Sequence, residues 1–141
     1  MKKPHGMPEH STPLQWPAGR SRTTSGNRDR AAFKNAGSRL TISKAADRLL
    51  HELDLMGGAR YFIFTSDLRT KGDGLPYSSQ PDPEDPGVAV YFLLQGDQFC
   101  LSCDRWTRVA DNIAAIAKHA EALRGIERWG VASVKRLLRS D

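Results

Sequence analysis

Basic side chains are concentrated near the start of the chain, where they could bind an anionic partner. Residues 1–40 contain eight of the 21 lysines and arginines and two of the 16 acidic residues, which gives this segment a net charge of +6. The remaining residues carry −1. Lysine and arginine bind nucleic-acid phosphates and release counterions, and tryptophan can stack on a base. The predicted nucleic-acid-binding residues are Trp16, Arg20, Arg22, Arg28, Arg30, Lys34 and Arg39.

The same segment is rich in proline, glycine, serine and threonine and has few large apolar side chains. Such a composition cannot bury enough apolar surface to offset the entropy cost of ordering the chain. We therefore expect residues 1–39 to form a disordered basic arm and residues 40–141 to form the folded domain. The alternative is a solvated tail without a ligand, because eight basic residues spread over forty do not form a dense cluster.

Two tryptophans outside the arm each follow an arginine in the sequence. Trp106 follows Arg105, and Trp129 follows Arg128. Tryptophan and arginine are enriched at the energetic centres of protein interfaces. Anchoring of the rings in the hydrophobic core is the default role, and the two pairs are the candidate partner-binding residues.

Two carboxylates are predicted to meet at one end of a β-hairpin. Asp85 precedes one predicted strand, and Asp104 ends the next. A metal-dependent nuclease also needs an acid-x-lysine sequence on the later strand to activate water, and Asp104-Arg105-Trp106 stands in its place. We therefore expect a structural ion pair of Asp85 with Arg105 or Arg108, and an unrecognised metal-dependent nuclease is the alternative.

The two cysteines form a Cys-x-x-Cys sequence, Cys100 to Cys103. A redox pair of this kind opens a helix, where the thiol pKa is lowered, whereas these cysteines lie in a predicted strand. Their side chains should point to opposite faces of the sheet, which predicts structural cysteines. A zinc site would need a second such pair, and no cofactor is expected.

The spacing of apolar residues predicts three helices and three strands. The helices are expected at 41–56, with Thr41 or Ser43 as N-cap, at 107–124 with a continuation to Trp129, and at 131–140. The strands are expected at 59–66, 87–94 and 99–104, with a hairpin turn at 95–98.

The order α-β-β-β-α-α predicts a single small α+β domain in which helices cover a three-stranded, mainly antiparallel sheet. A long loop at 67–87 joins the first two strands. Double-stranded RNA-binding domains, which read duplex shape, begin with the same order, but their second helix starts with a lysine cluster. The helix at 107–124 starts with one basic residue, Arg108, and element order alone is weak evidence of function.

Several sequence segments resemble the N-terminal region of J-domain-containing proteins encoded by phages, plasmids and other mobile elements of bacteria. The resemblance covers about Leu14 to Val131. Its most specific segments are Asp85-Pro86-Gly87-Val88-Ala89-Val90-Tyr91-Phe92, Cys103-Asp104-Arg105-Trp106 and Arg124-Gly125-Ile126-Glu127-Arg128-Trp129-Gly130. In those proteins a J domain with a His-Pro-Asp tripeptide follows and would recruit a heat-shock chaperone. The nearest string in this sequence is Gln80-Pro81-Asp82, which lacks the histidine.

These observations lead to one expected function and two alternatives. The expected function is that of a non-enzymatic accessory protein of a bacterial mobile element. Its arm would contact nucleic acid and its domain a partner protein. The first alternative is a protein-interaction adaptor related to J-protein chaperone systems, and the second is the nuclease. No apolar run approaches the roughly 18 residues of a membrane span and no secretory signal is visible, so a cytoplasmic bacterial location without membrane contact is expected.

Overall fold

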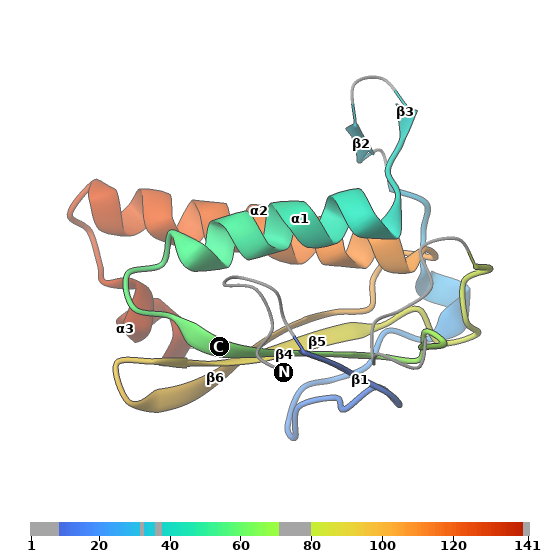
Figure 1. Cartoon of the computed structure of the whole chain (residues 1–141), viewed down its shortest axis with the longest axis horizontal. Coiled ribbons are helices and arrows are strands. Elements are labelled where there is room, and N and C mark those ends of the chain that lie inside the picture. Colours follow the sequence, from blue (N-terminus) through green and yellow to red (C-terminus); the bar gives the residue numbers. More distant parts are fainter. Residues whose placement is uncertain (1–8, 32, 36–37, 71–79, 140–141) are drawn as a thin grey trace.

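Two helices that run in the same direction cover one face of a four-stranded sheet (Figure 1). The computed structural model describes residues 9–31, 33–35, 38–70 and 80–139 of the 141-residue chain. The helices are α1 (Ile42–Asp54) and α2 (Val109–Arg128), and a short third helix, α3 (Val134–Arg139), lies beside the hairpin turn at Gln95. The small α+β domain that the sequence predicts is confirmed. None of the described helices is long and apolar enough to cross a membrane.

The prediction of a three-stranded sheet is wrong, because a fourth strand joins it. The strand order is β1-β4-β5-β6, with β1 (Glu9–Ser11), β4 (Arg60–Ser66), β5 (Val88–Leu94) and β6 (Asp97–Cys103). The strands β4, β5 and β6 are antiparallel neighbours, as predicted, whereas β1 pairs with β4 in parallel. Since β1 has three residues and no apolar alternation, its sequence carries no strand signal.

Residues 9–31 form an ordered segment, whereas the sequence predicts a disordered arm. After β1 the chain crosses the face of the sheet that the helices leave open (Figure 1). The Gln15 amide donates to the Thr65 hydroxyl at 3.1 Å, and the Tyr91 hydroxyl donates to the Gln15 carbonyl at 2.7 Å. Asp29 then forms a β-bridge with Trp106. Hydrogen bonds from backbone and polar side chains, rather than a buried apolar stripe, attach this segment to the domain.

The core lies between the sheet and the two long helices. Thr41 caps α1, as predicted, by accepting a hydrogen bond from the Lys44 amide at 3.2 Å. The hairpin between β5 and β6 turns at Gln95 and Gly96, which both have positive φ, as a two-residue type I′ loop requires. The buried side chains of the core include Leu49, Leu53, Phe64, Val90, Phe92, Leu101, Ile113 and Ile116.

The second half of the arm contains a helical turn and a small β-ribbon. A single 3₁₀ turn spans η1 (Ser25–Asn27). The strands β2 (Lys34–Asn35) and β3 (Ser38–Arg39) form a separate two-stranded ribbon at the end of the molecule where α1 begins (Figure 1).

Candidate nucleic-acid interface

Two of the predicted nucleic-acid-binding arginines, Arg22 and Arg28, bind acidic residues of the protein itself. Nη2 of Arg22 donates to both carboxylate oxygens of Asp85, at 2.6 and 2.8 Å, and its Nε donates to Asp104 at 2.8 Å. Nε of Arg28 donates to the Asp104 carbonyl at 2.8 Å, and its guanidinium lies 3.6 Å from both carboxylates. We call these four residues the arginine clasp. They attach the arm to the start of β5 and the end of β6.

The arginine clasp surrounds a carboxylate that is almost fully buried. Asp104 is 4% exposed. Burial by itself would raise the pKa of its carboxyl group, but hydrogen bonds from Arg22 and Thr23 outweigh burial, so the pKa is lowered. Asp104 is therefore an ionised acceptor whose oxygens are directed at protein groups.

The expected partners of Asp85 are wrong, although the expected meeting of Asp85 with Asp104 is confirmed. Arg105 instead pairs with Asp29 at 3.1 Å, and Arg108 lies 3.9 Å from Asp82. The arginines that pair with the Asp85 and Asp104 carboxylates come from the arm, at least 57 positions away in the sequence. Hairpin geometry could place the two acids together, but it could not reveal which cations reach them.

Trp16 is held by neighbours of its own segment. Its indole nitrogen donates to the Arg20 carbonyl at 3.0 Å. The guanidinium of Arg22 lies 4.5 Å from the ring centroid, and that of Arg20 lies 5.6 Å away. These cation–π contacts cover the surface that a stacked base would need, so Trp16 serves the arm's own structure.

Two further arm arginines, Arg30 and Arg39, lie in a groove at the N-terminal end of α2, whereas Arg20 lines a different hollow. Arg30, Arg39 and Arg108 line this groove, whose volume is about 660 Å³. Arg30 and Arg39 are exposed and, within the described part of the chain, form no ion pair. Phe33 adds an aromatic side chain to the same wall. We call it the arginine groove.

The arginine groove also contains two acidic residues, and each of them contacts another group of the protein. Asp82 accepts a hydrogen bond from the Val109 amide, the first N–H of α2, at 2.9 Å. Asp111 is 2% exposed, lies 3.8 Å from Arg108, and has a pKa that burial raises. Three guanidinium groups therefore face two carboxylates that are already committed, one to the helix end and one to Arg108.

Lys34 belongs to β2 and is opposite Arg39 in the ladder, but its side chain lies outside the described residues. Arg108 and Phe33 are the groove residues that sequence analysis did not select as nucleic-acid contacts. The available signals were a phenylalanine among the basic residues at the end of the arm and an arginine directly before a helix.

The four predicted partner-binding residues separate into two places. Trp106 is half-buried, and the centroid of its ring lies 6.1 Å from that of Phe33 and 5.4 Å from the Arg105 guanidinium. It therefore packs against Phe33, which lines the arginine groove. Trp129 lies at the other end of α2, about 30 Å away for a 20-residue helix. It is 70% exposed, and Arg128 lies 5.7 Å from its ring.

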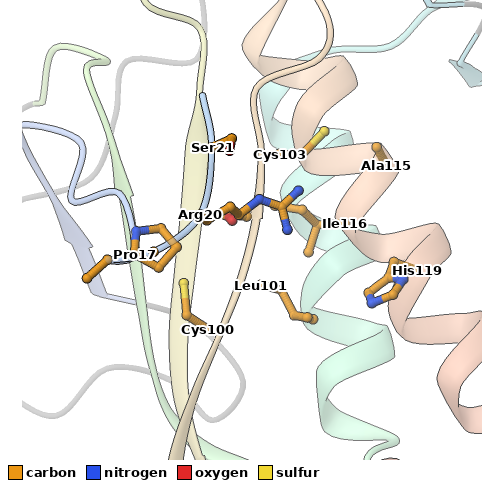
Figure 2. Close-up of a pocket in the computed structure, with 12 residues that line it drawn as sticks. Pro17, Arg20, Ser21, Cys100, Leu101, Cys103, Ala115, Ile116 and His119 are labelled. Atoms are coloured by element: carbon orange, nitrogen blue, oxygen red, sulfur yellow. The ribbon is translucent and has the colours of Figure 1, made fainter. Parts of the chain in front are cut away.

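The cysteines lie beside a second hollow, shown in Figure 2. Cys100 and Cys103 are half-buried. The Cys103 thiol lies 3.3 Å from Oδ1 of Asn112, and burial raises the pKa of Cys103. Burial also raises the pKa of the Cys100 thiol to about 11. Neither thiol is activated, which agrees with a structural role.

We expect the Cys100 thiol to react slowly with alkylating reagents. With a pKa of about 11 instead of 9.0, its thiolate fraction at pH 8 falls about 100-fold. In a Cys103→Ser variant, iodoacetamide should therefore label Cys100 far more slowly than a free model thiol, and the rate should rise steeply towards pH 11. Labelling at pH 8 as fast as that of the model thiol would contradict this prediction.

Comparisons with models of known protein families, with curated proteins and with solved structures found no match for this chain.

Proposed function

We propose that this protein is a non-enzymatic accessory protein that binds nucleic acid through the arginine groove. The observation that carries the proposal is the arrangement of Arg30, Arg39 and Arg108. These arginines come from three separate segments and line one groove, and two of them are exposed without an ion pair among the described residues. Guanidinium groups grouped in this way suit the phosphates of a nucleic-acid backbone.

The surroundings of the groove support an anionic ligand. It lies at the N-terminus of a 20-residue helix, where the helix dipole adds positive potential. Its volume of about 660 Å³ is within the usual range for small-ligand sites, so a phosphate and part of a nucleoside fit. Phe33 offers an aromatic surface for a base.

In this proposal, fewer arginines of the arm contact nucleic acid than the positive charge of the arm suggests. Arg22 and Arg28 hold Asp85 and Asp104, and Arg20 lines a different hollow. Phosphate contact therefore falls to Arg30 and Arg39 from the end of the arm, together with Arg108 from the domain. The resemblance to J-domain proteins of mobile elements supports a cytoplasmic accessory role in bacteria.

Protein binding is the second candidate function, and it rests on the opposite end of the molecule. Trp129 is 70% exposed and Val131 is 75% exposed, beside the C-terminal end of α2. Exposed aromatic side chains next to arginine are typical of interface hot spots. This end would supply the partner contact of an adaptor, with Arg128 at its rim.

Charge reversal in the arginine groove should weaken nucleic-acid binding. In fluorescence-anisotropy titrations with labelled single- and double-stranded DNA and RNA, Arg30→Glu and Arg39→Glu should each lower affinity about tenfold at low salt, because each removes a phosphate contact. The slope of log affinity against log salt should become shallower by about one.

The matched control is Arg60→Glu, which makes the same charge change at an exposed position at the start of β4. It should change affinity by much less than Arg30→Glu. Equal losses of affinity in both variants would show that the effect comes from net charge and not from the arginine groove. Absence of binding by the wild-type chain at low salt would overturn the proposal.

A further inference from the structure

The strand β6 forms one edge of the sheet and has unpaired backbone groups. In an antiparallel ladder, successive residues alternate between bonding to the neighbouring strand and pointing their N–H and C=O groups away from it. A two-residue turn closes on a bonded pair, here Leu94 and Asp97, so Cys100 and Ser102 point away from β5. Within the described chain, their backbones bond neither to the arm nor to α2.

This open edge is the floor of the hollow shown in Figure 2. Arm residues 17–21 form one wall, and Ala115, Ile116 and His119 of α2 form the other (Figure 2). The volume is about 760 Å³. The section of β6 that lines the hollow, residues 100–103, spans about 13 Å, enough for four residues of an added strand.

The side chains around this edge favour an acidic ligand. The twelve residues that line the hollow include Arg20 and His119 and no aspartate or glutamate. Arg20 is exposed and extends from the arm across the edge of β6 toward Ile116 (Figure 2). A carboxylate on an incoming strand would meet its guanidinium.

We propose that the edge of β6 binds an extended, acidic segment of a partner protein by strand addition. The backbone groups of Cys100 and Ser102 pair with the added strand, Ile116 and Ala115 contact its apolar side chains, and Arg20 pairs with a carboxylate. Backbone pairing supplies affinity in this mode, and the side-chain walls supply specificity. This site is separate from the arginine groove.

A second copy of the chain fits this edge less well than an acidic peptide does. If β6 paired with itself around a two-fold axis, the same surface would face itself on both sides. Arg20 of one copy would then approach Arg20 of the other without an acidic lining residue to separate them.

The test uses the full chain and a fluorescently labelled peptide of about six residues that alternates valine and glutamate. We expect saturable binding by fluorescence polarisation. The backbone amides of Cys100 and Ser102 should become protected from hydrogen exchange in NMR spectra when the peptide binds. Arg20→Glu should weaken binding at least tenfold, about 1.4 kcal/mol, whereas Arg20→Lys should retain most of it.

Two controls separate strand addition from simple charge attraction. The same peptide with N-methylated backbone amides keeps its carboxylates but cannot form the ladder, so it should not bind. Arg30→Glu, in the arginine groove, should leave peptide binding unchanged, whereas Arg20→Glu should leave nucleic-acid binding unchanged. The two proposals therefore fail independently.

Three results would overturn the proposal. The first is the absence of saturable peptide binding up to about 1 mM. The second is equal binding of the N-methylated peptide. The third is a concentration-dependent dimer in which Cys100 and Ser102 are already protected without peptide, which would assign the edge to a second copy of the chain.

Discussion

Replacing Asn112 by leucine is expected to lower the free energy of unfolding by about 3–5 kcal/mol. Asn112 is 0% exposed. Its Nδ2 donates to the carbonyl oxygens of Pro86 at 2.8 Å and Trp106 at 3.0 Å. Its Oδ1 accepts from the Trp106 amide at 2.9 Å and lies 3.3 Å from the Cys103 sulfur. Leucine of similar volume would leave these buried partners without hydrogen bonds.

Urea unfolding followed by circular dichroism measures this loss. Asn112→Asp is the matched control, because it keeps an acceptor for the Trp106 amide but cannot donate to the Pro86 and Trp106 carbonyls. Cys103→Ser keeps the shape of the side chain and should cost much less. A loss below about 1 kcal/mol in Asn112→Leu would show that the segment around Trp106 rearranges to satisfy these groups without Asn112.

Replacing Asp104 by alanine should release the arm and cost about 2–4 kcal/mol, because Arg22 and Arg28 lose their shared buried partner. Arg28 is 9% exposed on its side chain, so its charge would stay largely buried beside Asp85 alone. Limited trypsin digestion should then cleave after Arg20 or Arg22 much faster than in the wild-type chain. Unchanged digestion would mean that β1 and the Gln15 contacts suffice to hold the arm.

The arginine clasp also predicts a specific acid sensitivity. The folded pKa of Asp104 lies below its ordinary value of 3.8, so the stabilisation from its ionised form is fully present above pH 3.8 and is lost as pH falls through the folded pKa. Asp104→Asn should therefore show a smaller drop in unfolding free energy between pH 5 and pH 2. Asp47→Asn, which removes an exposed carboxylate on α1, should keep the drop.

The arginine clasp determines how the arm should be tested. Deleting residues 1–39 would remove β1 and both arginines of the clasp, and would expose Asp104 and the sheet face under Gln15. Loss of nucleic-acid binding in such a truncation would then report damage to the domain as much as loss of phosphate contacts. Single charge reversals at Arg30 and Arg39 avoid this difficulty, because both residues are exposed and neither belongs to the arginine clasp.

The elements that depend on neighbours in the sequence were predictable. The helices expected at 41–56 and 107–124 appear as α1 and α2, because apolar spacing is read along the chain itself. The hairpin followed from Gln95-Gly96 between two strands, and the turn then brought Asp85 near Asp104. The charge imbalance between the arm and the domain is likewise a property of composition.

What the sequence alone determined was thus the set of local elements and the excess of positive charge, whereas the tertiary structure decided what each charge does. Ion pairing depends on distance in space, so Arg22 binds Asp85 across 63 positions, and Arg30 and Arg39 remain to line a groove with Arg108. The addition of β1 depends equally on a distant partner, because a three-residue strand is stable once β4 supplies its ladder. No local pattern encodes contacts of this kind.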